Sequence, residues 1–138
     1  MKKSICILVI SVIILGVFYK LIIKDLSAIK VTSVGGIFLN DIQVESDLFK
    51  ANVTLGTSTA ILTDYTVNTD DDKIIITVYS KYFISENEKI DYVDDIVYNA
   101  DMSNINSIVI RDSENEREIW NNQKGIVWTN DFNPNCAN

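Results

Sequence analysis

The sequence predicts a mainly β protein: a small antiparallel β-sandwich or strongly bent sheet preceded by one apolar amino-terminal helix. Two observations carry this prediction. Beyond residue 24, short runs of β-branched and aromatic residues alternate with turn-forming residues, and apolar positions repeat with a period of two. The chain has 138 residues and one Pro, so residues 25–138 fit one domain. Residues 1–24 form a separate segment.

This amino-terminal segment contains a nearly uncharged apolar run at residues 4–23, interrupted by Lys20 and preceded by two lysines. An α-helix of about 20 residues crosses a bilayer core, and a lysine near its end can reach the interface. We therefore expect residues 1–24 to be an uncleaved signal-anchor helix of a single-pass cell-membrane protein, with the domain 25–138 outside the cytoplasm. A cleaved signal peptide and a secreted domain are the alternative, although no pair of small residues follows the apolar run at cleavage spacing.

The first expected strands are 29–34 and 37–44, joined by Gly35 and Gly36. Two adjacent glycines can supply positive φ at both centres of a two-residue turn, so this pair predicts a hairpin. A third strand, 48–55, follows a polar turn.

A second hairpin is expected from strands 59–67 and 73–83, which flank Asn-Thr-Asp-Asp-Asp at 68–72. These side chains favour turns because they accept local backbone hydrogen bonds. Both faces of 73–83 carry apolar or aromatic residues near its start. We therefore expect this strand to be central and covered on both sides.

Residues 90–100 keep strand alternation except at Asp94, which predicts an edge strand or a loop. A short helix over 86–95 is the alternative. The remaining strands are expected at 105–113 and 116–120, as a third hairpin, and at 125–128.

The composition excludes most catalytic chemistry. The chain has no His, which removes Ser-His-Asp and Cys-His nucleophiles and the usual His zinc sites. No GxSxG, SxxK or Gly-rich phosphate loop is present. Its two cysteines, Cys6 and Cys136, lie near opposite ends of the sequence and are not expected to form a bridge. We therefore expect neither an enzyme nor a cofactor.

The charge is unevenly distributed along the chain. Residues 25–138 carry all 19 acidic residues and eight of the 12 basic residues, a net charge of −11. Such a domain repels phosphate backbones, so nucleic acid is not an expected partner and a basic protein is. The expected function is a non-catalytic protein-binding domain, with a membrane contact through residues 4–23.

Two groups of residues are the expected partner-binding sites. The first consists of Asp91, Asp94, Asp95 and Asp101, and the second of Glu116, Glu118 and Trp120. On a strand, the three residues of the second group project to the same side. Paired carboxylates beside an aromatic ring also suit sugar binding or acid–base catalysis, but this requires two carboxyls facing each other across a cleft.

An alternative function, an exported cation- or small-ligand-binding domain, would use an acidic turn. Its candidate metal ligands are Asp70, Asp71 and Asp72, because hard cations prefer carboxylate oxygens. The spacing does not match an EF-hand, in which the sixth residue is Gly and the twelfth Glu, whereas Ile75 and Lys81 stand there. A solvated acidic hairpin tip is therefore the favoured interpretation of this cluster.

The runs "STAILTDYTV", "KIIITVYSKYF" and "INSIVIRDSENEREIW", within residues 58–120, resemble small membrane-anchored or exported β-domain proteins of unknown function from low-GC Gram-positive bacteria. In those proteins a basic apolar start precedes a short β domain that ends in Ile-Trp, here Ile119 and Trp120. The resemblance implies the topology and a β fold, and no catalytic residue. Some such proteins look like immunity proteins that neutralise toxins, so an immunity or envelope-interaction protein is the particular form implied.

Overall fold

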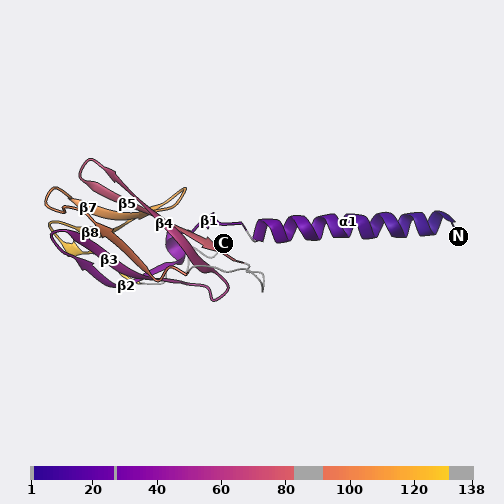
Figure 1. Cartoon of the computed structure of the whole chain (residues 1–138), viewed down its shortest axis with the longest axis horizontal. Helices are drawn as coiled ribbons and strands as arrows, with labels where there is room; N and C mark the ends of the chain where they lie inside the picture. Colours follow the sequence, from indigo (N-terminus) through magenta and orange to yellow (C-terminus); the bar gives the residue numbers. More distant parts are fainter. Residues whose placement is uncertain (1, 27, 83–91, 131–138) are drawn as a thin grey trace.

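The computed structural model describes residues 2–26, 28–82 and 92–130 (Figure 1). Within these residues, one α-helix, α1 (Lys2–Leu26), precedes nine strands in two sheets. The helix extends away from the β domain (Figure 1). The mainly β fold predicted from the sequence is confirmed.

The larger sheet contains β1 (Lys30–Val31), β4 (Ile61–Asp70), β5 (Lys73–Lys81), β7 (Ser107–Arg111), β8 (Glu116–Asn121) and β9 (Gly125–Ile126). The smaller sheet contains β2 (Ile37–Val44), β3 (Leu48–Leu55) and β6 (Asp95–Asn99). In the larger sheet, β5 lies between β4 on one side and β1 and β7 on the other, and β8 and β9 follow β7. In the smaller sheet, β3 lies between β2 and β6.

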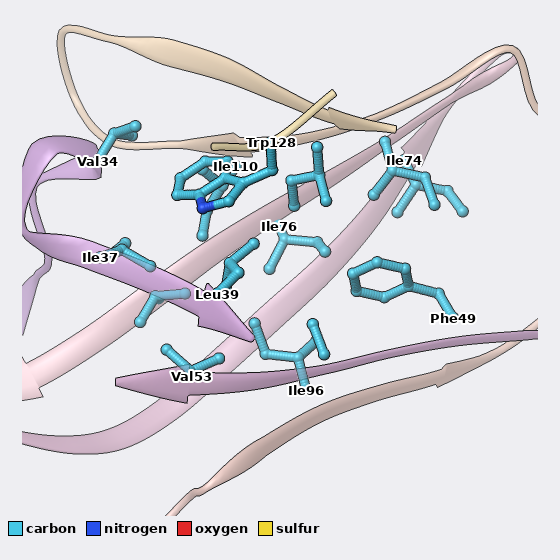
Figure 2. Close-up of a cluster of buried hydrophobic side chains, with 14 of the residues drawn as sticks. Val34, Ile37, Leu39, Phe49, Val53, Ile74, Ile76, Ile96, Ile110 and Trp128 are labelled. Carbon is cyan, nitrogen blue, oxygen red and sulfur yellow. The ribbon is translucent and has the colours of Figure 1, made fainter. Parts of the chain in front are cut away.

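The two sheets share one hydrophobic core, an arrangement consistent with a β-sandwich (Figure 2). Every second residue of a strand points to the same face, so each sheet presents an apolar inner face to the other. The core includes Phe49, Val53 and Ile96 from the smaller sheet and Ile74, Ile76, Val78, Ile108 and Ile110 from the larger sheet.

The expected central strand is confirmed as β5. Ile74, Ile76 and Val78 are fully buried on its inner face. On its outer face Ile75 is also buried, opposite Val109 of β7, which is its register partner. Both faces near the start of β5 are therefore covered, as its apolar sequence predicts.

Two predicted hairpins are confirmed as β4–β5 and β7–β8, and the predicted third strand, 48–55, is β3, which pairs with β2. The β4–β5 turn is closed by Asp70 opposite Lys73, with Asp71 in the left-handed region at φ 52°. Asp and Asn tolerate this conformation better than most residues, which is why an acidic turn suits the site. β6 is an edge strand, as expected, and part of the alternative helix over 86–95 lies outside the described residues.

The hairpin predicted at Gly35 and Gly36 is wrong. A 3₁₀ turn (Val34–Gly36) carries the chain between the sheets, because β1 pairs with β5 and β2 with β3. The Gly36 N–H donates to the Ser33 carbonyl at 2.9 Å, and neither glycine has positive φ. Val34 is only 4% exposed and belongs to the shared core. The glycines specify a turn, but long-range pairing decides which sheet each arm joins.

One strand pair departs from the predicted antiparallel arrangement. β5 and β7 run parallel, with Lys73 opposite Ser107 and Ile76 opposite Ile110. Between them the chain crosses to the smaller sheet to form β6, and then returns. A parallel pair needs such a crossover, because no short turn can reverse the direction twice.

The predicted membrane-spanning helix is wrong. In the part of the chain that the structure describes, no helix is both long and apolar enough to cross a membrane. The uncharged run that begins at Ser4 ends at Tyr19, because Lys20 follows, and it is shorter than the about 20 residues that a bilayer core requires. A single-pass protein of the cell membrane, with its span at residues 4–23 and its carboxyl-terminal domain outside the cytoplasm, is therefore not supported.

Candidate protein-binding surface

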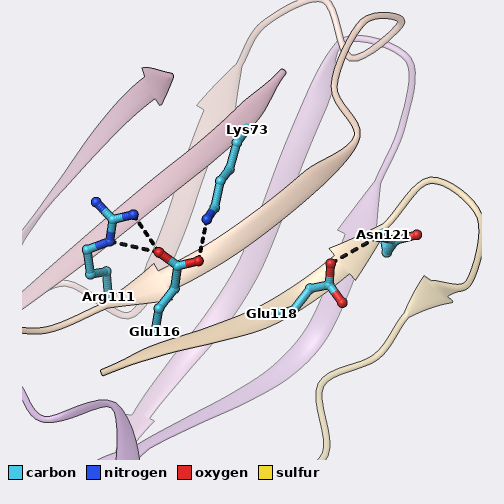
Figure 3. Close-up of polar contacts among 5 residues, drawn as sticks. All are labelled: Lys73, Arg111, Glu116, Glu118 and Asn121. Carbon is cyan, nitrogen blue, oxygen red and sulfur yellow. Dashed lines mark hydrogen bonds and ion pairs between the residues drawn. The ribbon is translucent and has the colours of Figure 1, made fainter. Parts of the chain in front are cut away.

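Glu116 lies on the outer face of the larger sheet, where three strands contribute to an ion-pair cluster (Figure 3). Its carboxylate accepts hydrogen bonds from Lys73 Nζ on β5 and from Arg111 Nε on β7, the latter at 2.9 Å. The bond from Lys73 lowers the pKa of Glu116; partial burial opposes this shift and Arg111 adds to it. A carboxylate held ionised by two cations is poorly suited to act as a general acid near neutral pH.

Glu118 lies on the same outer face, two residues from Glu116 on β8, as predicted. Its Oε1 accepts a hydrogen bond from Asn121 Nδ2 at 3.0 Å (Figure 3). The two carboxylates thus each have partners within the same sheet, and they follow one another along one strand rather than facing each other across a cleft.

Trp120 does not share this face, contrary to the prediction. The β7–β8 register shifts so that Trp120 lies opposite Ile108, whereas Glu118 lies opposite Val109. Ile119 is therefore the additional residue of a β-bulge, which reverses the alternation. Directly opposite residues share a face, so Trp120 lies on the side of the buried Ile108 and packs against the core.

Asp94 and Asp95 lie at the start of β6, and Asp91 lies outside the described residues. Asp95 forms an ion pair with Lys50 Nζ at 2.9 Å and accepts a hydrogen bond from Asn52 Nδ2 at 3.2 Å. The hydrogen bond from Lys50 and then that from Asn52 lower the pKa of Asp95. Asp94 is exposed and accepts hydrogen bonds at its backbone carbonyl. This pair lies on the smaller sheet, apart from Glu116 and Glu118.

Four turns meet at the end of the β domain opposite α1 (Figure 1). We call this end the distal end; it consists of residues 45–47, 70–72, 100–106 and 122–124. Backbone hydrogen bonds connect the turns. They run from Ala100 N to Asp47 O at 3.1 Å, from Asn106 N to Asp72 O at 2.7 Å and from Asn122 N to Asn106 O at 3.1 Å.

The distal end is strongly acidic. Its acidic residues are Glu45, Asp47, Asp70, Asp71, Asp72 and Asp101, all of them exposed, and its basic residue is Lys124. Asp101 accepts a hydrogen bond from the Ser103 N–H at 2.9 Å, which lowers its pKa. The structure thus joins Asp101 to the predicted acidic turn. Sequence reasoning missed Glu45 and Asp47 because their proximity depends on how the hairpins assemble.

The acidic turn was also the candidate metal site. Among the described residues, no group of three or more His, Cys, Asp or Glu side chains is arranged to hold a metal ion. The Asp72 carboxylate instead accepts a hydrogen bond from Asn106 Nδ2. The turn therefore contributes exposed charge and a contact to the neighbouring turn.

Two side chains that the sequence did not single out close the edges of the smaller sheet. Tyr65 Oη accepts from the Val97 N–H at 3.2 Å and donates to the Val97 carbonyl at 3.1 Å. Asn130 Oδ1 accepts from the Leu39 N–H at 3.1 Å, and Asn130 Nδ2 donates to the Leu39 carbonyl at 2.7 Å. Each side chain satisfies an outward-facing backbone pair that could otherwise recruit another strand. No sequence pattern marks such residues, because they act on strands distant along the chain.

Comparisons with protein-family models, curated proteins and solved structures found no match for this chain. The resemblance to small Gram-positive β-domain proteins therefore stays a prediction. The functional argument rests on the chain's own residues.

Proposed function

We propose that this chain is a non-catalytic protein-binding domain that recognises a basic protein through its distal end. The observation that carries the proposal is the concentration of six exposed carboxylates on four adjoining turns, with one lysine among them. An immunity protein that neutralises a basic toxin is the particular form that this surface supports.

Electrostatics favours this function. Exposed charges of one sign accelerate the approach of an oppositely charged partner, and they suppress binding of acidic proteins. The effect acts over about 10 Å at 0.1 M salt, so charges on adjoining turns act together. Charge on this surface therefore supports both the rate and the selectivity of association.

The hydrogen bonds between the turns support the same function. A surface whose loops are already ordered loses less conformational entropy on binding than one whose loops must be ordered by the partner. The bond from Asn106 to Asp72 joins the β4–β5 and β6–β7 turns, and that from Asn122 to Asn106 adds the β8–β9 turn. Most of the acidic residues thus stand on connected backbone.

The test uses the purified full chain as bait against the cellular and secreted proteins of its source organism, with elution by a salt gradient. A triple variant, Glu45→Gln, Asp47→Asn and Asp71→Asn, neutralises three distal carboxylates. Because these side chains make no hydrogen bond to another described residue, stability should be unchanged. We expect a basic partner that binds at least about tenfold more weakly to this variant, because each lost charge weakens the attraction.

A matched control neutralises the same number of carboxylates away from the distal end: Asp41→Asn, Asp94→Asn and Glu114→Gln. These positions are also exposed. The control should bind the partner nearly as tightly as the wild type. Equal losses in both triple variants, or capture of no basic protein, would contradict the proposal.

A further inference from the structure

The edge of β4 differs from the other long edges of the two sheets. β4 is ten residues long and pairs with β5 alone. On the smaller sheet, Tyr65 blocks the edge of β6 and Asn130 blocks that of β2. At the opposite end of the larger sheet, β9 has only two residues. The edge of β4 is therefore the long one on which a further strand could form.

The direction of the backbone groups follows from one hydrogen bond. The Thr32 N–H donates to the Val78 carbonyl at 2.8 Å, so Val78 directs its backbone groups toward β1, away from β4. Alternate residues of a strand behave alike, and Ile76 does the same. Its register partner in β4, Val67, must then point its own N–H and C=O groups away from β5, to the open side.

The same alternation applies to Tyr65 and Thr69. The Tyr65 N–H confirms the direction, because it is satisfied on the open side by Asp64 Oδ1 at 2.8 Å. No backbone hydrogen bond on this side joins Val67 or Thr69 to another part of the chain that the structure describes. Two successive N–H and C=O pairs are therefore without a backbone partner among the described residues, at the spacing that an added strand needs.

We propose that this edge, from Tyr65 to Asp70, accepts an extended basic segment of the partner as an additional strand of the larger sheet. The inference rests on the proposed protein-binding function and specifies its mode. Strand addition combines backbone hydrogen bonds, which supply affinity, with alternate side-chain contacts, which supply specificity. The edge leads directly into the distal end at Asp70.

Charge identifies the occupant. On the outer face β4 carries four exposed residues, the neutral Thr66 and Asn68 and, on either side of them, Asp64 and Asp70, so the residues of the added strand nearest the two carboxylates should be Lys or Arg. On the inner face lie the half-buried Val67 and the exposed Thr69, whose hydroxyl contacts the Tyr98 hydroxyl at 3.2 Å. Residues facing this side should be small or apolar. The fitting segment therefore alternates basic residues with Val, Thr or Ala.

A second copy of this chain fits less well. If two β4 edges paired antiparallel about Val67, Asp64 of each copy would lie opposite Asp70 of the other. Like charges directly opposite each other destabilise a strand pair. The charge pattern thus favours a basic segment over self-association.

The first test measures binding of the capped peptide Lys-Thr-Lys-Val-Lys-Thr-Lys to the full chain by calorimetry at low salt, with a mild non-ionic detergent to keep α1 from aggregating. We compare Thr69→Pro, which removes one outward N–H, with Thr69→Ala, which keeps it. Pro is tolerated where a strand's N–H faces outward, so both variants should fold. We expect Thr69→Pro to bind at least about tenfold more weakly and Thr69→Ala within about twofold of wild type.

A second probe tests the proposal on the unmodified protein. Two N-methylated forms of the same peptide are compared, one methylated at its odd-numbered residues and the other at its even-numbered residues. Only one of these forms lacks the N–H donors that face β4. We expect one methylated form to lose binding and the other to retain it. Equal binding of both forms, or binding by Thr69→Pro equal to that of Thr69→Ala, would overturn docking at this edge.

The experiments separate this inference from the proposed function. If a basic partner captured through the distal end binds Thr69→Pro as tightly as wild type, the edge is not the docking site, while the protein-binding function stands. If neither a basic partner nor the peptide binds, the function itself fails. A dimer that Thr69→Pro dissociates would assign the edge to a second copy and overturn the proposed occupant.

Discussion

Replacing Asn130 with alanine is expected to destabilise the domain by about 3 kcal/mol, because three of the four hydrogen bonds of its side chain are partly buried and each is worth about 1 kcal/mol. Two join it to the backbone of Leu39, and the third is donated by Trp128 Nε1 at 2.7 Å. The fourth, donated to Asn40 Oδ1 at 3.2 Å, is exposed and adds little. Leu39 is 2% exposed and Trp128 7%, so water would replace these partners poorly. The loss should lower the melting temperature by roughly 10 °C in a domain of this size.

The assay is urea unfolding of the full chain followed by tryptophan fluorescence. We expect the midpoint to fall with the slope unchanged, since the surface exposed on unfolding stays the same. Asn99→Ala is the matched control: Asn99 is exposed on β6, and its side chain makes no hydrogen bond to another described residue. It should change stability by less than about 0.5 kcal/mol. Equal midpoints for the two variants would refute the role assigned to Asn130.

Asn130→Asp adds a test by pH. Its ionised carboxylate can accept from the Leu39 N–H and from the Trp128 indole, but it places a second acceptor beside the Leu39 carbonyl. Protonation restores a donor there, so folding should raise the pKa of the new carboxyl above that of an unfolded Asp. The destabilisation is then present at neutral pH and decreases as the pH falls through the raised pKa. A deficit that stays constant with pH would contradict this geometry.

Two further predictions concern single hydrogen-bonding groups. Tyr65→Phe removes both bonds to Val97 and should cost about 1–2 kcal/mol in urea unfolding, whereas Tyr98→Phe, which loses one exposed contact, should cost less than about 0.5 kcal/mol. Burial raises the pKa of Asp112, but hydrogen bonds from Val34 and two residues of its own turn outweigh this and lower it below the ordinary 3.8. Asp112→Asn should therefore lower the free energy of unfolding by about 1 kcal/mol at neutral pH. This difference from the wild type should shrink below pH 3.8, because the wild-type carboxyl then protonates. A difference that acid leaves unchanged would contradict the assignment.

Strand positions and turn residues could be predicted because they depend on local chemistry. The alternation of Ile74, Ile75 and Ile76 with their neighbours predicts a strand covered on both faces, and β5 is that strand. The Asp-rich turn at 70–72 predicts a hairpin, which the left-handed Asp71 completes. In each case backbone preference and side-chain periodicity act within a few residues.

Features that depend on pairing between distant segments could not be predicted in this way. The bulge at Ile119 moves Trp120 off the face of Glu118, although an ideal strand would keep both together. The exposed carboxylates of Asp47 and Asp101 share the distal end only because hairpins from both sheets assemble there. The candidate surface is therefore a product of assembly, even though each acidic residue is visible in the sequence.

By itself, the sequence determined the β class, the hairpin turns of β4–β5 and β7–β8, the central strand and the acid excess. Tertiary structure alone decided that Gly35 and Gly36 lie in a crossing between sheets and that β5 and β7 run parallel. It also decided that Tyr65 and Asn130 close the edges of the smaller sheet, whereas no described strand pairs with the edge of β4 from Tyr65 to Asp70. The physical reason is that side-chain periodicity specifies which face of a strand is buried, whereas strand order follows from packing that face against segments far away in the chain.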